Sequence, residues 1–166
     1  MDEPELNLVY RPYTLIVDSR EQSSYDFRDI EANKAEGGGT IVVKTKRDGL
    51  KTGDYSIEGF EDKISVERKE ISDLFNCVGG DRDRFERQLF RLNELDHGFV
   101  VVEADWARIM RGVERSKLDP KTVSRSVIGW QQRKEFRNVH WWMAPGKRFA
   151  EKITFRILDR YWRKQQ

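Results

Sequence analysis

The chain has 166 residues, of which 37% are hydrophobic and 36% are charged. This length suits one domain with a buried core and excludes a helicase or tandem-domain machine, and the apolar content excludes a disordered chain. No apolar run approaches the roughly 20 residues of a membrane span, and the acidic start lacks the features of a secretory signal. A single cysteine, Cys77, cannot form an internal disulfide, so a reducing compartment is expected.

The small net charge of +2 hides an asymmetry along the chain. Residues 1–103 contain 15 Lys or Arg against 23 Asp or Glu, whereas residues 104–166 contain 16 against 6. A basic part favours a polyanion partner such as nucleic acid, and an acidic part can supply the carboxylates of a metal site. Charge alone leaves the alternative open that the basic part is an ordinary solvated helical face.

Short β-branched and aromatic runs predict four strands in the first part of the chain. They cover residues 13–17, 40–46, 53–57 and 63–69, after an N-terminal extension at 1–12. Between the first two strands, residues 26–36 favour a short helix ended by three glycines. A polar turn joins the last two strands, which predicts an antiparallel meander.

From residue 70 onward, apolar residues recur mainly at helical spacing. Helices are predicted over residues 70–78, 82–96, 105–111, 120–136 and 148–163, and strands over 98–103 and 139–143. Strands with interspersed helices predict a single α/β domain over 1–166, with a central mixed sheet flanked by helices.

Two of these strands carry side chains with a chemical role. Side chains two apart on a strand point to the same face, so Glu67 and Lys69 emerge together while Arg68 points the other way. If the meander forms, Asp54 comes close to Glu67. Adjacent carboxylates repel unless a cation lies between them, and oxygen ligands suit Mg²⁺ or Mn²⁺ better than zinc. A lone Glu-x-Lys pair, however, is also common as a solvated salt bridge.

Two blocks of residues extend this pair into a recognisable motif. One has the shape G-D-x(n)-E-R-K-x(3)-D, from Gly53-Asp54 through Glu67-Arg68-Lys69 to Asp73, and the other is Asp18-Ser19-Arg20-Glu21 at a strand end. Together they resemble the nuclease domain of the XPF (ERCC4-type) family of structure-specific endonucleases, a branch of the restriction-endonuclease-like fold. The resemblance runs from about residue 13 to the last helix.

The resemblance implies roles for the motif residues. Asp54 and Glu67 would bind Mg²⁺, for which Mn²⁺ would substitute, together with the backbone carbonyl of Arg68. Lys69 would orient or activate the attacking water. Other motif residues would support the site, either at a second metal position or by fixing the ligands of the first; they are Asp18, Arg20, Glu21, Arg68 and Asp73. The implied reaction is hydrolysis of a DNA phosphodiester near a branch or a single-strand/duplex junction, leaving a 5′-phosphate and a 3′-hydroxyl.

The sequence departs from the family in its domain content. Family members usually carry a tandem helix-hairpin-helix domain after the nuclease, and some carry a helicase before it, whereas neither is expected here. The preference among flaps, forks and bubbles therefore stays open, as does RNA as a substrate. A small nuclease of this kind suits the cytoplasm of a prokaryote or a phage-infected cell, or the nucleus if the source is eukaryotic.

Basic and polar side chains beside the motif and in the basic part are candidates for DNA contact. They are Arg20, Arg84, Gln88, Arg91, Arg125, Arg133 and Lys134. Arg84, Gln88 and Arg91 form a stripe at helical spacing, for which a solvated helix face is the alternative interpretation.

The last helix predicts a homodimer because its apolar surface is broad. The residues concerned are Phe149, Ile153, Phe155, Ile157, Leu158, Tyr161 and Trp162. A small domain buries one face of such a helix, and the remainder forms a patch that is typical of an interface. Nuclease domains of the XPF family, which the chain resembles, also form dimers through this part of the fold. The alternative is that the helix packs entirely into its own core.

Three classes of function are compatible with these patterns. A metal-dependent DNA endonuclease is the main hypothesis, because Asp54, Glu67 and Lys69 are all present. A catalytically silent DNA-binding scaffold of the same fold is the second, and a structural or protein-binding domain is the third. A cleavage assay with Mg²⁺ and with EDTA separates the three.

Overall fold

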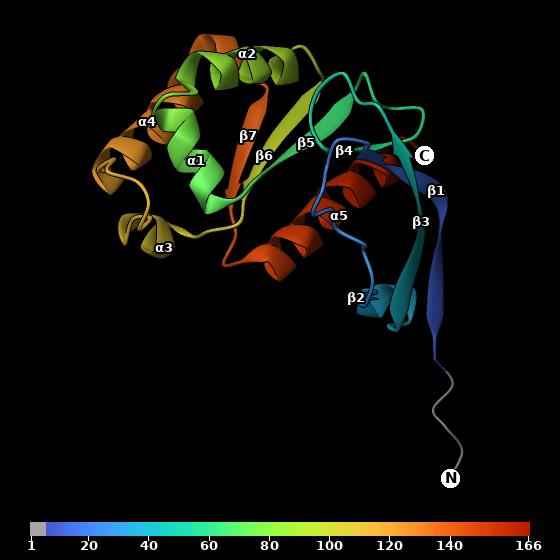
Figure 1. Ribbon diagram of the computed structural model, residues 1–166. Coiled ribbons are helices and arrows are strands. Elements are labelled where there is room, and N and C mark those ends of the chain that lie inside the picture. Colours follow the sequence, from blue (N-terminus) through green and yellow to red (C-terminus); the bar gives the residue numbers. More distant parts are fainter. Residues whose placement is uncertain (1–5) are drawn as a thin grey trace.

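A mixed seven-stranded sheet forms the centre of the computed structural model, which describes residues 6–166 (Figure 1). The strands are β1 (Leu8–Asp18), β2 (Ile30–Glu31), β3 (Thr40–Asp48), β4 (Tyr55–Ile57), β5 (Ile64–Lys69), β6 (His97–Val102) and β7 (Val139–Met143). The helices are α1 (Ile71–Val78), α2 (Arg82–Asn93), α3 (Trp106–Met110), α4 (Pro120–Gln132) and α5 (Lys147–Lys164), with 3₁₀ turns at Lys34–Glu36 and Lys134–Phe136. The predicted α/β class is confirmed.

The sheet joins two parallel groups of strands through one short antiparallel strand. Its order is β2-β3-β1-β4-β5-β6-β7, in which β1 pairs with β3 in parallel and β5, β6 and β7 run parallel to one another. β4 is antiparallel to both β1 and β5, which confirms the predicted meander. Because β4 lies between the end of β1 and β5, the two motif blocks of the sequence meet at the middle of the sheet.

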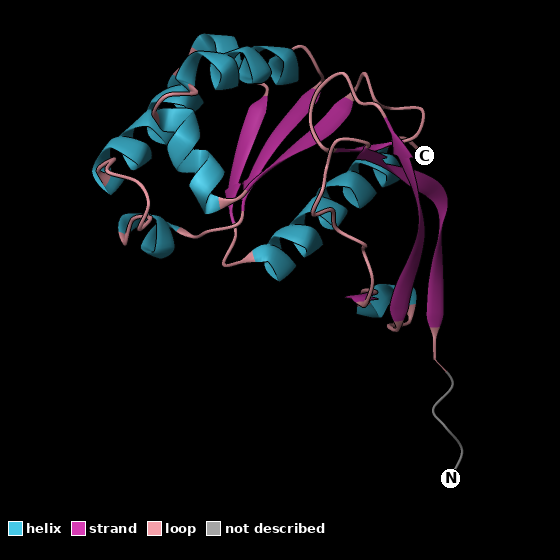
Figure 2. Cartoon of the chain, in the orientation of Figure 1, coloured by secondary structure: helices cyan, strands magenta, loops and turns pink. Residues whose placement is uncertain are grey.

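Helices cover the two faces of the sheet separately (Figure 2). α1, α2 and α4 pack on one face, where Val100 and Val102 of β6 join a buried cluster with Phe85. α5 packs on the other face, where Val101 lies in a second cluster with Phe155. Consecutive residues of β6 thus serve opposite cores, as the alternation of side chains along a strand requires. Among the described residues, no helix combines the length and apolar character that crossing a membrane needs.

The first part of the chain differs from the sequence prediction in two places. No α-helix forms over residues 26–36, because Phe27 and Asp29 have φ angles of 54° and 53° and Ile30 pairs with β3. The left-handed backbone at two nearby positions interrupts a right-handed helix. β1 begins at Leu8, opposite Thr40, so the expected extension is a sheet strand from residue 8 onward, while residues 1–5 lie outside the described part.

Two helices also end earlier than predicted. The helix expected over 82–96 ends at Asn93, and the helix expected over 120–136 ends at Gln132. The second ends because Arg133 takes an extended conformation, with ψ of 130°, before the short 3₁₀ turn. These shorter helices leave the positions of the motif residues unchanged.

The end of α5 is held to β1 by a buried ionic cluster. Asp159 accepts hydrogen bonds from Arg11 Nε at 2.7 Å and from the Tyr13 hydroxyl at 2.6 Å, and it forms an ion pair with Arg163 at 3.1 Å. Arg11 also pairs with Glu36 at 2.8 Å. The cluster fixes the early part of β1 against the last turns of α5.

Candidate active site

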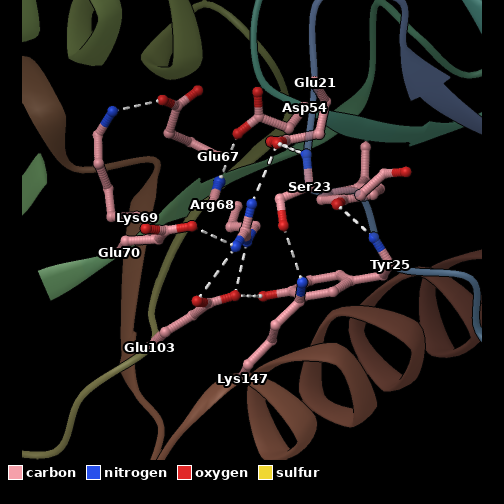
Figure 3. Close-up of polar contacts among 12 residues, drawn as sticks. Glu21, Ser23, Tyr25, Asp54, Glu67, Arg68, Lys69, Glu70, Glu103 and Lys147 are labelled. Atoms are coloured by element: carbon pink, nitrogen blue, oxygen red, sulfur yellow. Dashed lines mark hydrogen bonds and ion pairs between the residues drawn. The ribbon is translucent and has the colours of Figure 1, made fainter.

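β5 and the residue before β4 bring the central acidic pair together. Asp54 donates its backbone N–H to Val66 O at 2.8 Å, and its Oδ2 accepts the Arg68 backbone N–H at 2.7 Å. Glu67 lies on the same strand and is 6% exposed. The pairing of the meander thus places the two carboxylates side by side, as the sequence predicted (Figure 3).

Lys69 stands beside Glu67 on the same face of β5. Its Nζ lies 2.7 Å from Glu67 Oε1 and 5.1 Å from the centre of the Phe85 ring. Burial lowers the pKa of Lys69, but the nearby carboxylates, Glu67 foremost, outweigh it and raise this pKa above its ordinary value. Lys69 is therefore a cation at neutral pH and acts through its charge and its N–H donors.

Asp54 is held in conditions that disfavour its ionised form. Burial, followed by the negative charge of Glu67, raises the pKa of Asp54 well above its usual range, and Glu21 adds to the effect. A divalent cation between the two carboxylates would remove that repulsion. The donor set therefore fits a hard cation with oxygen ligands.

The backbone supplies one further oxygen at this point. The N–H and C=O of one residue in an extended strand point to the same side, and the Arg68 N–H points to Asp54. The Arg68 carbonyl consequently faces the Asp54 side of β5. Within the described residues no set of three or more His, Cys, Asp or Glu side chains is arranged to hold a metal. A cation here would rely on the two carboxylates and this carbonyl.

A polar cavity of about 250 Å³ opens over the acidic pair. It is lined by Asp18, Arg20, Glu21, Lys51, Thr52, Gly53, Asp54, Glu67, Arg84, Gln88 and Arg91. Asp18 fixes one wall, because it accepts Arg20 Nε at 2.9 Å and the Leu50 N–H at 2.9 Å. Burial raises the pKa of Asp18, but these hydrogen bonds prevail and hold the pKa below its ordinary value.

α2 forms the opposite wall of this cavity and borders a second hollow. Arg84 and Gln88 line both the main cavity and a neighbouring one of about 150 Å³. Asp73 lies in the second hollow with Lys69 and does not line the cavity over the acidic pair. The structure thus brings together the predicted stripe on α2 and the motif, and it places Asp73 at their margin.

Three predicted DNA contacts lie away from this cavity. Arg125, Arg133 and Lys134 are not among its lining residues. Arg133 instead pairs with Glu86 at 3.1 Å and lies 4.4 Å from the centre of the Phe136 ring. Its guanidinium stabilises the junction of α2 with the second 3₁₀ turn, while Arg125 and Lys134 are exposed.

Arg68 points to the other face of β5, where Glu103 binds it. The separation is 2.6 Å between Arg68 Nε and Glu103 Oε1. Glu103 was not among the predicted site residues, because it lies 35 positions from Arg68 in the chain. Its place directly after the buried strand β6, which runs parallel to β5, is the signal that could have identified it.

The fold and the site define a domain of the restriction-endonuclease-like class. The family model named "ERCC4 domain" matches residues 17–142, which includes all the motif residues and α2. The chain therefore belongs to the ERCC4 domain family.

Solved structures of XPF from Aeropyrum pernix share this fold. The first has a TM-score of 0.64 and 19% sequence identity, and the match covers 90% of this chain and 65% of that one. The second, described as a complex with DNA, has a TM-score of 0.57 and 22% identity, and the match covers 93% and 66%. The chain thus spans just under two thirds of these XPF chains. No curated protein matches it in sequence.

Proposed function

We propose that the protein is a metal-dependent, structure-specific DNA endonuclease that cleaves near branches or single-strand/duplex junctions. The observation that carries this proposal is the adjacent pair Asp54 and Glu67, of which Glu67 is buried, with the Lys69 ammonium 2.7 Å from Glu67 Oε1. The pair lies in a polar cavity whose α2 wall carries Arg84 and Arg91. Membership of the ERCC4 domain family supports the same activity.

Asp54, Glu67 and the Arg68 carbonyl would hold Mg²⁺, with Mn²⁺ as a substitute. When bound, the cation would supply Lewis-acid stabilisation of the phosphate and lower the pKa of an attacking water. Lys69, held as a cation by Glu67, would orient that water or donate to the phosphate oxygen on which negative charge grows. Both roles need a fixed ammonium, and the ion pair supplies it.

The cavity walls would hold the DNA backbone in place for this attack. Arg84 and Arg91 offer guanidinium groups that match phosphate oxygens, and Gln88 adds an amide between them. On the opposite wall, Arg20 is fixed by Asp18 and Lys51 is exposed. Positive groups on both sides of the carboxylates would keep the phosphate at the acidic pair.

Cleavage of a labelled panel tests the proposal. The panel contains flap, fork, splayed, duplex and single-stranded DNA, each incubated with Mg²⁺, Mn²⁺ or EDTA. The proposal predicts cleavage of junction-containing DNA in either metal and none in EDTA. Binding without cleavage in every metal would instead indicate a silent scaffold. The absence of both binding and cleavage would contradict any role with DNA.

We infer in addition that the protein pairs with a second copy beside α5. Phe155 and Leu158 are buried in the core, as the single-chain alternative required. Trp142 and Phe149, however, remain 48% and 50% exposed. Trp142 borders a cavity of about 510 Å³ that Ile153 and Ile157 also line. This apolar surface supports the inference of a homodimer.

Sedimentation at micromolar concentration tests the homodimer. The variant Trp142→Glu changes an exposed side chain and should give a folded 19.7 kDa monomer, while the unmodified chain should sediment as a dimer. Tyr161 and Trp162 are unsuitable targets because Tyr161 packs on Phe60 and Trp162 on Tyr13. A monomer for the unmodified chain would contradict the inference.

A further inference from the structure

The Arg68 side chain meets three carboxylates on the face of β5 opposite the lysine. Its Nη1 lies 3.0 Å from Glu21 Oε1, its Nη2 lies 2.8 Å from Glu70 Oε1, and its Nε lies 2.6 Å from Glu103 Oε1. The side chains of Arg68 and Glu103 are 5% and 8% exposed, whereas that of Glu70 is 47% exposed. Water competes for Glu70, so the two less exposed carboxylates, Glu21 and Glu103, are the partners that fix the guanidinium.

Glu103 binds Arg68 at two points and is itself held at two more. A second bond joins Arg68 Nη2 to Glu103 Oε2 at 3.2 Å, which makes the pair bidentate. The Tyr25 hydroxyl donates to Glu103 Oε1 at 2.7 Å, and the Tyr25 ring centre lies 5.3 Å from the guanidinium (Figure 3). The Glu103 backbone N–H also donates to Lys69 O at 2.8 Å. The contacts with Glu103, which follows β6, therefore fix the plane of the Arg68 guanidinium.

Arg68 in turn fixes Glu21 at the edge of the main cavity. Glu21 Oε1 accepts Arg68 Nη1 at 3.0 Å and the Ser23 backbone N–H at 3.2 Å. Glu21 lines the cavity together with Asp54 and Glu67. A long arginine side chain has many rotamers, so a single contact with Glu21 would not hold both groups in place.

We propose that Glu103 is a positioning residue for the site: it holds the Arg68 guanidinium so that Arg68 keeps the Glu21 carboxylate beside Asp54. The consequence for the reaction rests on the proposed function. Glu103 binds Nε and Nη2 of the Arg68 guanidinium while Glu21 binds Nη1, so Arg68 links Glu103 to the cavity. Outer partners of this kind typically alter metal affinity or turnover 10- to 100-fold, given as an order of magnitude.

The variant Glu103→Gln breaks this hold with little change in shape. The Gln Oε1 still accepts from Arg68 Nε and from Tyr25, but its NH₂ group then faces Arg68 Nη2, donor against donor. Glu70→Gln is the matched control, because it alters an exposed partner of the same guanidinium. Tyr25→Phe is a second, milder variant, which removes one donor to Glu103 and keeps the ring.

Three measurements on the full chain test the proposal. NMR of arginine Nε–H groups should show a slowly exchanging Arg68 signal in the unmodified chain and in Glu70→Gln, and a rapidly exchanging one in Glu103→Gln. Mn²⁺ affinity, measured by electron paramagnetic resonance, or the single-turnover rate should fall about 10- to 100-fold in Glu103→Gln, less in Tyr25→Phe and not in Glu70→Gln. The KM for DNA should stay unchanged.

Failure of this proposal is distinguishable from failure of the proposed function. If the unmodified chain binds Mn²⁺ without cleaving DNA, the endonuclease activity is refuted, and the NMR signal and Mn²⁺ affinity still decide the role of Glu103. An unchanged Arg68 signal with unchanged Mn²⁺ affinity in Glu103→Gln overturns the proposal. Equal losses in Glu103→Gln and Glu70→Gln overturn it as well, because they would show a general charge effect. If Glu103→Gln does not fold, Tyr25→Phe decides in the same way.

Discussion

Replacing Asp54 by Asn should stabilise the metal-free protein at neutral and alkaline pH. Burial and the charge of Glu67 raise the pKa of Asp54 to about 8, from 3.8 for a free carboxyl. The folded state therefore binds this proton more tightly than the unfolded state does. The resulting contribution to stability is complete below pH 3.8 and is lost as the pH rises toward 8.

The magnitude follows from the same shift. At pH 7 the folded-state carboxyl is still mostly protonated, and keeping that proton costs up to about 4 kcal/mol relative to the unfolded chain, because each pKa unit corresponds to about 1.4 kcal/mol. Glu67 shares the repulsion and the site relaxes, so we expect Asp54→Asn to raise the free energy of unfolding by about 1–3 kcal/mol at pH 8. The Asn side-chain oxygen can still accept the Arg68 backbone N–H, so no buried donor is left unpaired.

Urea denaturation in EDTA at pH 5, 7 and 8 measures this effect. The gain of Asp54→Asn over the unmodified chain should grow with pH, while Glu61→Gln, an exposed control, should change little at any pH. Adding Mg²⁺ should stabilise the unmodified chain and not Asp54→Asn. A variant that is less stable than the unmodified chain at pH 8, or a gain independent of pH, would contradict the raised pKa of Asp54.

Three further outcomes are expected from other parts of the molecule. Affinity for DNA should fall steeply with salt, and Arg84→Ala should reduce the log–log slope by about 0.9 for duplex DNA, as fluorescence anisotropy would show, whereas Arg125→Ala should not. Asp159→Ala should lower the free energy of unfolding by about 2–4 kcal/mol in urea melts, because it leaves the buried Tyr13 hydroxyl without an acceptor and removes one of the two carboxylates that pair with Arg11. Burial raises the pKa of the Cys77 thiol to about 11, so iodoacetamide at pH 7.5 should label it only after unfolding.

The centre of the site could be predicted from the sequence because the patterns that place its side chains involve residues that are close together in the chain. Alternation along a strand places Glu67 and Lys69 together and sends Arg68 to the other face. The meander, read from two short strands and a polar turn, brings Asp54 to the same point. These two inferences required only neighbouring residues.

The rest depended on contacts between distant segments. The left-handed backbone at Phe27 has no signal in residue type, and Asp29 gives only a weak one, because Asp adopts this conformation more often than most residues but still infrequently. β1 extends back to Leu8 because β3 offers it a partner. Glu103 follows a strand that the sequence does predict, but it joins the site because that strand, β6, lies parallel to β5, and this pairing has no local signal.

The most direct test of the central claim is the single-turnover rate on the best junction substrate, measured for the unmodified chain in Mg²⁺ and in EDTA and for Asp54→Asn in Mg²⁺. Cleavage is expected for the unmodified chain in Mg²⁺ and not in EDTA, and the Asp54→Asn rate in Mg²⁺ should be lower by at least about 100-fold while the variant stays folded and binds the same DNA. Equal rates for Asp54→Asn and the unmodified chain in Mg²⁺, or equal rates in Mg²⁺ and EDTA, would contradict it.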